Sequence, residues 1–196
     1  MYRLLSYIVL LGYLSLKALT LKEVYDSSSS GNGYEKYIIL ENGGDYYGGL
    51  YLNGVDAVNT AIIGNGAKIY LENDSIVFSN TDKRLDITDC FLIYGGIYYI
   101  GETVIPKGEI SYCTFYEPYH YGVNLKYCGT GIAIKRNIVV NAIEDGGSFT
   151  TPTGINFVFS NKEQFGFPDI NENWSFNSQL QLPNCTRNFA RLCETG

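Results

Sequence analysis

Three stretches of the sequence share one pattern: Leu85–Gly96 (LDITDCFLIYGG), Gly108–Pro118 (GEISYCTFYEP) and Gly131–Gly147 (GIAIKRNIVVNAIEDGG). In each stretch, apolar and polar residues alternate around a central isoleucine. Alternation with a period of two is typical of a β-strand that buries one face. An asparagine or cysteine follows three residues after the isoleucine, where the strand pattern breaks. Asparagine tolerates the left-handed backbone of a tight corner, so each stretch predicts a strand, a corner and a second strand.

The pattern recurs along the chain with a period of about 24 residues. Successive aliphatic positions lie 24, 24, 23, 24, 24 and 24 residues apart, and they are Ile39, Ile63, Ile87, Ile110, Ile134, Val158 and Leu182. The residues three places later are Asn42, Gly66, Cys90, Cys113, Asn137, Asn161 and Cys185. A period of 24 is too long for a coiled-coil heptad and too short for a helical-hairpin repeat. It suits one turn of a right-handed parallel β-helix.

Two further apolar columns predict two more strands in each turn. One comprises Leu52, Ile76, Tyr99 or Ile100, and Val123, and the other comprises Ile69, Ile93, Tyr116 and Val140. We therefore predict an all-β fold, a right-handed parallel β-helix (solenoid) of about six to seven turns. Turns of such a coil stack at about 4.8 Å, so buried asparagines at the corner are expected to bond up and down the stack. An ordinary sandwich with evenly spaced strands, the alternative, does not explain the repeated corner residue.

The three quoted segments resemble the pectin-lyase-like superfamily of parallel β-helices, and the resemblance covers roughly residues 35 to 161. It implies a groove along the outer face of one sheet, where these enzymes bind an extended polysaccharide and cleave it by hydrolysis or β-elimination. The Asn-Thr-Asp, Asp-Asp, Gly-His-Gly and Arg-Ile-Lys motifs of the hydrolase branch are not intact in this sequence. The resemblance therefore concerns architecture more than activity.

The first 20 residues combine Arg3 with an apolar run from Leu4 to Leu16. The run is too short to span a bilayer but fits a signal-peptide core, and an apolar cap packed on the first coil is the alternative. Thr20–Ser27 is expected to form a cap helix over the end of the coil, where strand edges would otherwise be exposed. The predicted organisation is a signal peptide at 1–20, a cap helix and linker at 21–33, the parallel β-helix at 34–166, and a degenerate last turn or C-terminal tail at 167–196.

The net charge is −6 and the chain contains no basic run, so the sequence predicts no nucleic-acid partner. We expect an extracellular monomer with no stable membrane insertion once the signal is removed.

Cys90 and Cys113 occupy one column on consecutive turns, so they are either a disulfide or two reduced thiols in a stacked core.

A pair of carboxylates is the first candidate site. Asp86 and Glu109 fall on one outward column, with Ala133 on the next turn. Hydrolysis of a glycosidic bond needs two carboxyl groups about 5 to 9.5 Å apart, and neighbouring turns would supply that spacing. The alternative is an acidic outer surface that keeps the sheet soluble.

The segment from Tyr112 to Lys126 (YCTFYEPYHYGVNLK) is the second candidate. β-Elimination needs a cation that neutralises the uronate carboxylate and a base near the adjacent C–H. His120 and Lys126, together with Arg136 on the following turn, are the candidate catalytic residues. The aromatic rings expected to stack on sugars are those of Tyr112, Tyr119 and Tyr121.

No cofactor is predicted, and calcium is the only ion that the sequence suggests. Asp82, Asp86 and Asp89 cluster with Arg84, as in the calcium-dependent lyases of the same superfamily. Calcium needs six to eight oxygens around one point, whereas outward residues on a strand spread them along a line. A charged loop leading into a strand is the alternative for this cluster.

The sequence thus predicts a secreted protein directed at carbohydrate, either a polysaccharide lyase or glycoside hydrolase or a protein that only binds. The alternative is a non-catalytic structural or adhesin-like scaffold.

Overall fold

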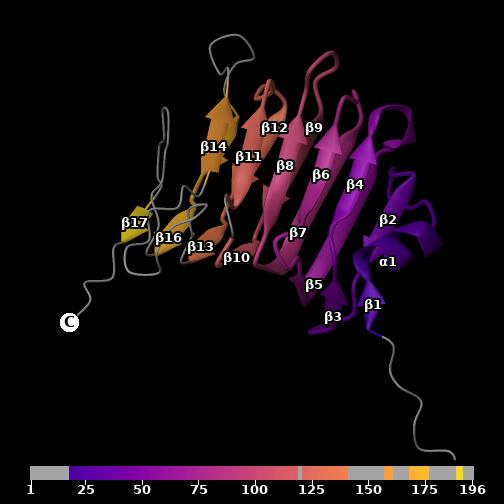
Figure 1. The fold of residues 1–196 in the computed structure, drawn as a ribbon, viewed down its shortest axis with the longest axis horizontal. Coiled ribbons are helices and arrows are strands. Elements are labelled where there is room, and N and C mark those ends of the chain that lie inside the picture. The colour runs from indigo at the N-terminus through magenta and orange to yellow at the C-terminus, as the bar shows by residue number, and fades with distance from the viewer. Residues whose placement is uncertain (1–17, 119–120, 141–156, 161–167, 177–188, 192–196) are drawn as a thin grey trace, which may run out of the picture.

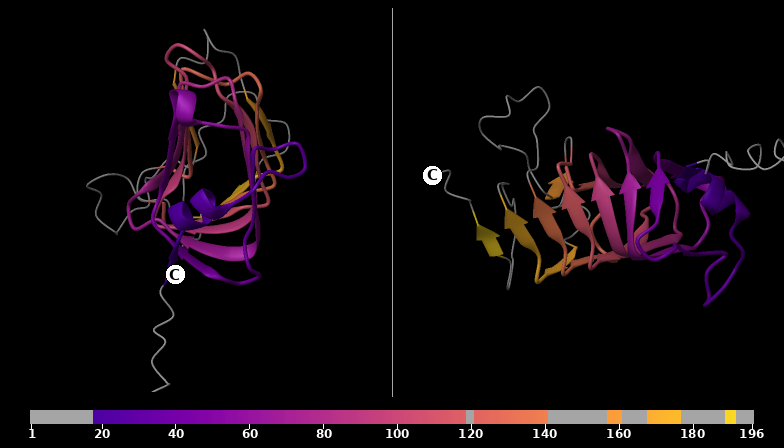
Figure 2. Two further views of the ribbon diagram at one scale, coloured as in Figure 1. Left: turned by 90° about the vertical axis from the view of Figure 1, so that its right-hand side faces the viewer. Right: turned by 90° about the horizontal axis from the view of Figure 1, so that it is seen from below.

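A computed structural model describes residues 18–118, 121–140, 157–160, 168–176 and 189–191. The chain winds into a coil whose strands lie side by side along one axis (Figure 1), and a view along that axis shows a closed outline (Figure 2). The pairings between the named strands are all parallel. The predicted all-β parallel solenoid is confirmed. Its described part makes about five turns, fewer than the six to seven predicted.

Each turn contributes strands to three sheets, which we call A, B and C. Sheet A contains β2 (Lys36–Ile39), the first halves of β5 (Thr60–Tyr70) and β7 (Arg84–Ile93), β9 (Lys107–Ser111), β12 (Ile132–Lys135) and β15 (Asp169–Asn171). Sheet B contains β1 (Leu19–Thr20), β3 (Asp45–Tyr47), the second halves of β5 and β7, β10 (Thr114–Tyr116), β13 (Ile138–Val140), β16 (Trp174–Phe176) and β17 (Phe189–Arg191). Sheet C contains β4 (Leu50–Asn53), β6 (Ser75–Ser79), β8 (Gly96–Ile100), β11 (Val123–Lys126) and β14 (Phe157–Ser160), and a short 3-10 turn, Gly54–Asp56, follows β4. Because β5 and β7 run through the corner, sheets A and B form one 12-stranded hydrogen-bonded sheet.

A column of isoleucines faces inward from sheet A and fills the centre of the coil. Its members, paired strand to strand and all buried, are Ile38, Ile62, Ile87, Ile110, Ile134 and Ile170. The predicted register is confirmed at Ile87, Ile110 and Ile134. It is wrong by one residue in the first two turns, where Ile39 is 60% exposed and Ile38 points inward.

Two features of the chain explain the shifted register. The doublets Ile38–Ile39 and Ile62–Ile63 satisfy alternation in either phase. In addition, the corner of β5 is two residues longer than that of β7. Three residues separate Ile63 from Ala67, whereas one residue separates their partners Thr88 and Cys90. The predicted member Val158 is also wrong, because it lies on β14 and pairs with Asn124 in sheet C. Ile170 takes its place after a repeat of 36 residues, counted from Ile134. Leu182 lies outside the described residues.

Sheets B and C complete the core. The inward column of sheet B is one residue earlier than predicted from Leu92 onward, and it comprises Tyr46, Ile69, Leu92, Phe115 and Val139. Of the residues predicted for sheet C, Leu52, Ile76, Tyr99 and Val123 are buried, whereas the alternative Ile100 is half-buried, and the buried ones belong to two neighbouring columns. One comprises Leu50, Ile76, Ile97 and Val123, and the other comprises Leu52, Phe78, Tyr99 and Leu125. The three inward surfaces form a single apolar core.

The corner between sheets A and B has a left-handed backbone in successive turns. The left-handed residues have φ between 51° and 56°, and they are Asn65, Asp89, Tyr112, Arg136 and Glu172. Next to this stack, the buried Asn137 side chain donates to Ile110 O and to Asn173 Oδ1, each at 2.9 Å, and accepts from Cys113 N at 2.9 Å. The predicted asparagine ladder is therefore confirmed at Asn137. Its next member is Asn173, while the predicted Asn161 and Cys185 lie outside the described residues.

Cys90 and Cys113 are both buried and free in this corner column, so the structure shows the reduced alternative. The Cys113 thiol beside it, together with burial, raises the pKa of Cys90 well above its usual value. These thiols pack as small apolar side chains of the core.

The predicted cap helix is present as α1 (Leu21–Ser27), at the end of the coil beside β1 (Figure 1). Thr20 Oγ1 accepts from Glu23 N at 3.1 Å, and the Glu23 carboxylate accepts from Thr20 N at 3.0 Å, which forms a capping box. Leu21 and Tyr25 are buried against the first turn.

Residues 1–17 of the predicted signal peptide lie outside the described residues, and the domain boundaries stay predictions. No helix of the described segments has the length and apolar character that crossing a bilayer requires.

Candidate functional site

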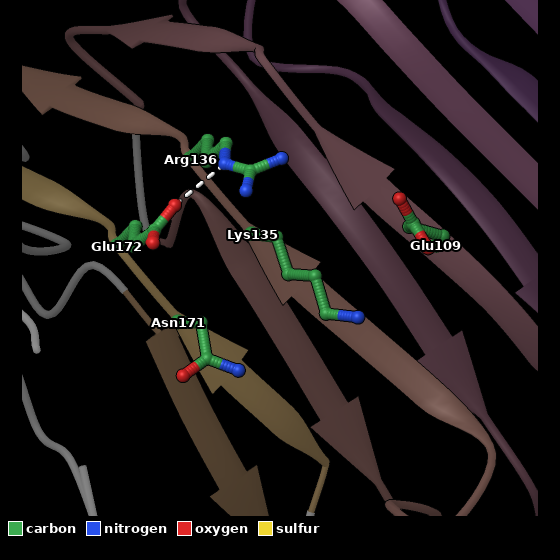
Figure 3. A pocket seen from close by; sticks show the side chains of 5 residues that line it. All are labelled: Glu109, Lys135, Arg136, Asn171 and Glu172. Carbon is green, nitrogen blue, oxygen red and sulfur yellow. Dashed lines mark hydrogen bonds and ion pairs between the residues drawn. The ribbon is translucent and has the colours of Figure 1, made fainter. Parts of the chain in front are cut away.

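Two adjoining pockets lie on the outer face of sheet A, and Glu109 lines both. One pocket, about 360 Å³, is lined by Asn32, Tyr34, Tyr37, Ala61, Ile63, Arg84, Asp86, Ile87, Thr88, Glu109 and Ser111. The other, about 340 Å³, is lined by Glu109, Lys135, Arg136, Asn171 and Glu172 (Figure 3). We call the two together the groove. It passes from β2 to β15 across the intervening strands of sheet A.

Small outward side chains leave the space for the groove. Outward positions of sheet A form two columns across the strands. One column reads Tyr37, Ala61, Asp86, Glu109, Ala133 and Asp169, and the other reads Ile39, Ile63, Thr88, Ser111, Lys135 and Asn171. Ala61 on β5, Thr88 on β7 and Ser111 on β9 have short side chains, so this part of the sheet is lower than its neighbours Tyr37 and Lys135. The outward column predicted for Asp86, Glu109 and Ala133 is confirmed.

Two tyrosines form the wall of the groove at its N-terminal end. A short loop closes through an antiparallel bridge between Gly31 and Tyr34, and its Tyr34 ring stacks on Tyr37 with centroids 6.3 Å apart. The Tyr34 hydroxyl donates a hydrogen bond to the Asp86 carboxylate. Burial, followed by this contact with Asp86, raises the pKa of Tyr34.

Asp86 holds this wall in place. Its carboxylate accepts hydrogen bonds from the Tyr34 hydroxyl, from Arg84 Nε at 2.5 Å and from the backbone N of Glu109 at 2.6 Å. The hydrogen bond to Asp86 also raises the pKa of Arg84. A carboxylate with three donors is fixed and well satisfied, so Asp86 is a positioning residue for the loop in this structure.

The two cations of the second pocket are each bound to a carboxylate. Lys135 Nζ lies 2.8 Å from Asp169, and this contact raises the pKa of Lys135. Arg136 Nε lies 2.5 Å from Glu172, an ion pair that crosses to the next turn (Figure 3). Arg136 also donates to the Tyr112 hydroxyl at 2.6 Å, with its guanidinium 5.4 Å from the centre of that ring. Contacts of the Arg136 side chain therefore connect three successive turns at the corner beside the groove.

Glu109 differs from the other acidic residues of the groove. Within the described part of the chain, its carboxylate forms neither an ion pair nor a hydrogen bond, although Lys135 lies near enough to feel its charge. In Figure 3 it points outward from the strand next to Lys135. Glu109 is thus the groove carboxylate whose oxygens are not engaged by another described residue.

The structure brings some of the predicted site residues together and separates others. Asp86 and Glu109 are direct neighbours on β7 and β9, and Tyr112 contacts Arg136 at the corner. Lys126 belongs to β11 in sheet C, where its amine lies 5.2 Å from the centre of the Tyr127 ring, and it lines neither pocket. Tyr121 precedes β11 by two residues and lines neither pocket. Tyr119 and His120 lie outside the described residues.

The segment from Tyr112 to Lys126 is therefore not one loop. It contains all of β10 and all of β11, so it begins at the corner between sheets A and B and ends in sheet C. Among the described residues, no group of three or more His, Cys, Asp or Glu side chains is arranged to hold a metal ion. Of the suggested calcium cluster, Asp86 faces the groove, Asp89 sits at the left-handed corner and Asp82 precedes β7 near Lys83.

Sequence reasoning missed Tyr34, Tyr37, Lys135 and Asn171. Lys135 follows the register isoleucine Ile134, so alternation alone places it outward and could have found it. Tyr37 could have been found only with the correct phase of the first turn. Asn171 follows the lengthened repeat, where the period gives no guidance.

Comparisons of the chain with protein-family models, with curated proteins and with solved structures found no match.

Proposed function

We propose that this protein binds carbohydrate and that an extended sugar chain lies along the groove of sheet A. The observation that carries the proposal is the groove itself, which crosses consecutive in-register strands and is lined by polar side chains with two tyrosines at one end. Extracellular location and a relationship to the pectin-lyase-like β-helices belong to the proposal. The parallel coil and the Asn137–Asn173 ladder support that relationship.

The spacing of the coil suits an extended polymer. Adjacent strands lie about 4.8 Å apart, so a chain laid along the axis meets a new set of side chains at each strand. Glu109, Lys135 and Asn171 offer acceptors and donors to hydroxyl groups. The rings of Tyr34 and Tyr37 offer apolar surface to the C–H face of a sugar, as aromatic side chains do in ligand pockets.

The contacts within the groove favour binding over turnover. Glycoside hydrolysis needs two carboxyl groups, one of which donates a proton. Of the neighbouring pair, Asp86 is held by three donors, and only Glu109 is open to a ligand. β-Elimination needs a cation for the uronate, whereas Arg84, Lys135 and Arg136 are each bound to a carboxylate.

The outer face of sheet B supports the second candidate, a non-catalytic surface scaffold. Its rings pack on one another along the axis, with Tyr47 on Tyr70 at 5.1 Å and Phe91 on Tyr116 at 6.3 Å between centroids. Farther along, Ile138 and Trp174 are 37% and 46% exposed. Apolar surface of this kind is typical of interaction faces.

The test is binding of the folded protein to a panel of soluble polysaccharides by affinity electrophoresis, with release of reducing ends followed in parallel. Thr88→Tyr fills the groove, and Thr114→Tyr makes the same change on an outward position of sheet B. We expect retardation without new reducing ends, lost in Thr88→Tyr and kept in Thr114→Tyr. Equal behaviour of the two variants would contradict the groove as the site. No retardation by any polysaccharide, with the circular dichroism of the coil intact, would favour the scaffold.

A further inference from the structure

The charged side chains that line the groove are equal in number, three cations against the carboxylates of Asp86, Glu109 and Glu172, but their pairing is uneven. The cationic side chains Arg84, Lys135 and Arg136 are bound to Asp86, Asp169 and Glu172, respectively. These three pairs leave Glu109 as the carboxylate without a partner of its own in the described part of the chain. Lys107, which pairs in register with Arg84, is exposed and lines neither pocket. Because Lys135 is bound to Asp169, which lines neither pocket, a ligand at the point where the two pockets join meets Glu109 as a carboxylate without a cation bound to it in the described residues.

The ion pair nearest to Glu109 is itself firmly held. Asp169 binds the Lys135 amine at 2.8 Å and also accepts from the Asn171 side chain. To pair with a carboxylate of the ligand, Lys135 would have to break its ion pair with Asp169. On the other side, Asp86 fixes the backbone of Glu109 at 2.6 Å, so the strand that carries the free carboxylate is anchored. A uronate in the groove would face Glu109 with no cation released to neutralise it, and like charges at close range are unfavourable.

We propose that the groove takes an amino sugar with a free, protonated amine and that the Glu109 carboxylate is its ionic partner. The proposal rests on the proposed function of the groove as a carbohydrate site. It names the chemical class, a polymer or oligomer with 2-amino groups, and it excludes the polyuronates that the sequence first suggested. An ammonium group beside Glu109 would gain a charge-assisted hydrogen bond, which is stronger than a bond between neutral groups.

The experiment compares three ligands on the full chain by isothermal titration calorimetry. They are a fully deacetylated glucosamine oligosaccharide, the N-acetylated oligosaccharide of equal length and an oligogalacturonate, at a pH at which the sugar amine is protonated. Glu109→Gln removes the charge and keeps the shape. Glu102→Gln makes the same change at an exposed residue outside both pockets, and so controls for general attraction of a cation to an acidic protein.

We expect the deacetylated ligand to bind about tenfold more tightly than the N-acetylated ligand, as one charge-assisted hydrogen bond would give. Glu109→Gln should abolish that preference and Glu102→Gln should keep it. Tighter binding of the oligogalacturonate, or equal losses in Glu109→Gln and Glu102→Gln, would overturn the inference. Binding of the N-acetylated ligand with no preference for the amine would overturn it too, while leaving the carbohydrate function standing. No binding of any of the three ligands would overturn both.

Discussion

The outer faces of sheets A and B meet at the same corner, yet they differ in what they offer to solvent. Both sheets cover one core, sheet A with a column of isoleucines and sheet B with a column that mixes aliphatic and aromatic residues. On sheet A, the outward positions include Ala61, Thr88 and Ser111, and the face is hollow. On sheet B, stacked rings fill the equivalent space, as between Tyr47 and Tyr70.

This difference shows how a solenoid acquires a site. The coil requires only that inward columns be apolar and that corners accept a left-handed backbone. Outward columns are free of that requirement, so a groove arises where short side chains succeed one another across several strands. Long side chains at its ends, such as Tyr37 and Lys135, then become walls. If this view is correct, substitutions should affect stability strongly when they face inward and weakly when they face the groove.

The largest effect is expected from an inward residue that both faces share as core. Ile110→Ala removes a fully buried side chain and leaves a cavity, which should lower the free energy of unfolding by about 2–5 kcal/mol. Urea denaturation would measure the loss. Ser111→Ala, the next residue and an outward one, should cost less than about 1 kcal/mol, because its hydroxyl makes one long contact of 3.3 Å to Thr88. Similar losses in both variants would contradict the inward and outward assignment.

The corner that joins the two sheets should be nearly as sensitive. Asn137→Ala removes the side-chain partner of the buried Cys113 N–H and of the Ile110 carbonyl, together with one of the hydrogen bonds to Asn173, and should cost about 3 kcal/mol. Asn42→Ala is the matched control, since the Asn42 side chain is exposed and donates one bond to Asn65 O at 3.0 Å. We expect the control to lose less than about 1 kcal/mol in the same denaturation experiment. An Asn137→Ala variant as stable as Asn42→Ala would show that the ladder is dispensable.

A smaller effect should separate the two outer faces directly. Tyr116 stacks on Phe91 and also contacts the edge of Tyr94, at centroid distances of 6.3 and 6.5 Å. Tyr116→Ala should therefore cost about 1–2 kcal/mol, whereas Thr88→Ala on the groove floor should cost about 0.5 kcal/mol or less. Thermal unfolding followed by circular dichroism would compare them. A larger loss at Thr88 would mean that the groove floor supports the coil rather than a ligand.

The smallest effect concerns the third face and appears only at high pH. The Tyr51 hydroxyl on sheet C donates to Asp74, and this hydrogen bond raises the pKa of Tyr51 from 10.0 to about 12. The phenol of the unfolded chain therefore loses its proton first, so stability should fall as the pH rises from about 10 to about 12. Below pH 10 this group should contribute no pH dependence. The change should be slight because Tyr51 is 62% exposed, and Tyr51→Phe should remove it from a pH series of denaturation curves.

Much of the fold could be predicted from the sequence because the repeat is encoded in residue types. The 24-residue period identified the coil, and Ile87, Ile110 and Ile134 fixed the correct inward phase in the middle of the chain. At the N-terminal end the phase was wrong by one residue, because Ile38 and Ile39 are equally apolar. Beyond Ile134 the period failed, since the next turn needs 36 residues to reach Ile170.

The candidate site could be predicted only in part. The adjacency of Asp86 and Glu109, and that of Tyr112 and Arg136, follow from a fixed period. Among the described residues, the Asp86 carboxylate is hydrogen-bonded and the Glu109 carboxylate is not. The sequence could not predict this difference, because one donor to Asp86 is Tyr34, which lies 52 residues away in sequence. The separation of Lys126, in sheet C, from Arg136, at the corner of sheets A and B, likewise depends on where β10 ends and the chain turns toward sheet C.

Because the turns stack in parallel, the number of turns sets the length of the groove. Each added turn advances the coil by one strand spacing, about 4.8 Å, without disturbing the turns on either side. Duplicating the turn that carries Glu109 would lengthen the groove by one rung and place a second identical carboxylate in line with the first. The length of the groove would then be set by the number of turns, and gene duplication could change it by one strand spacing at a time.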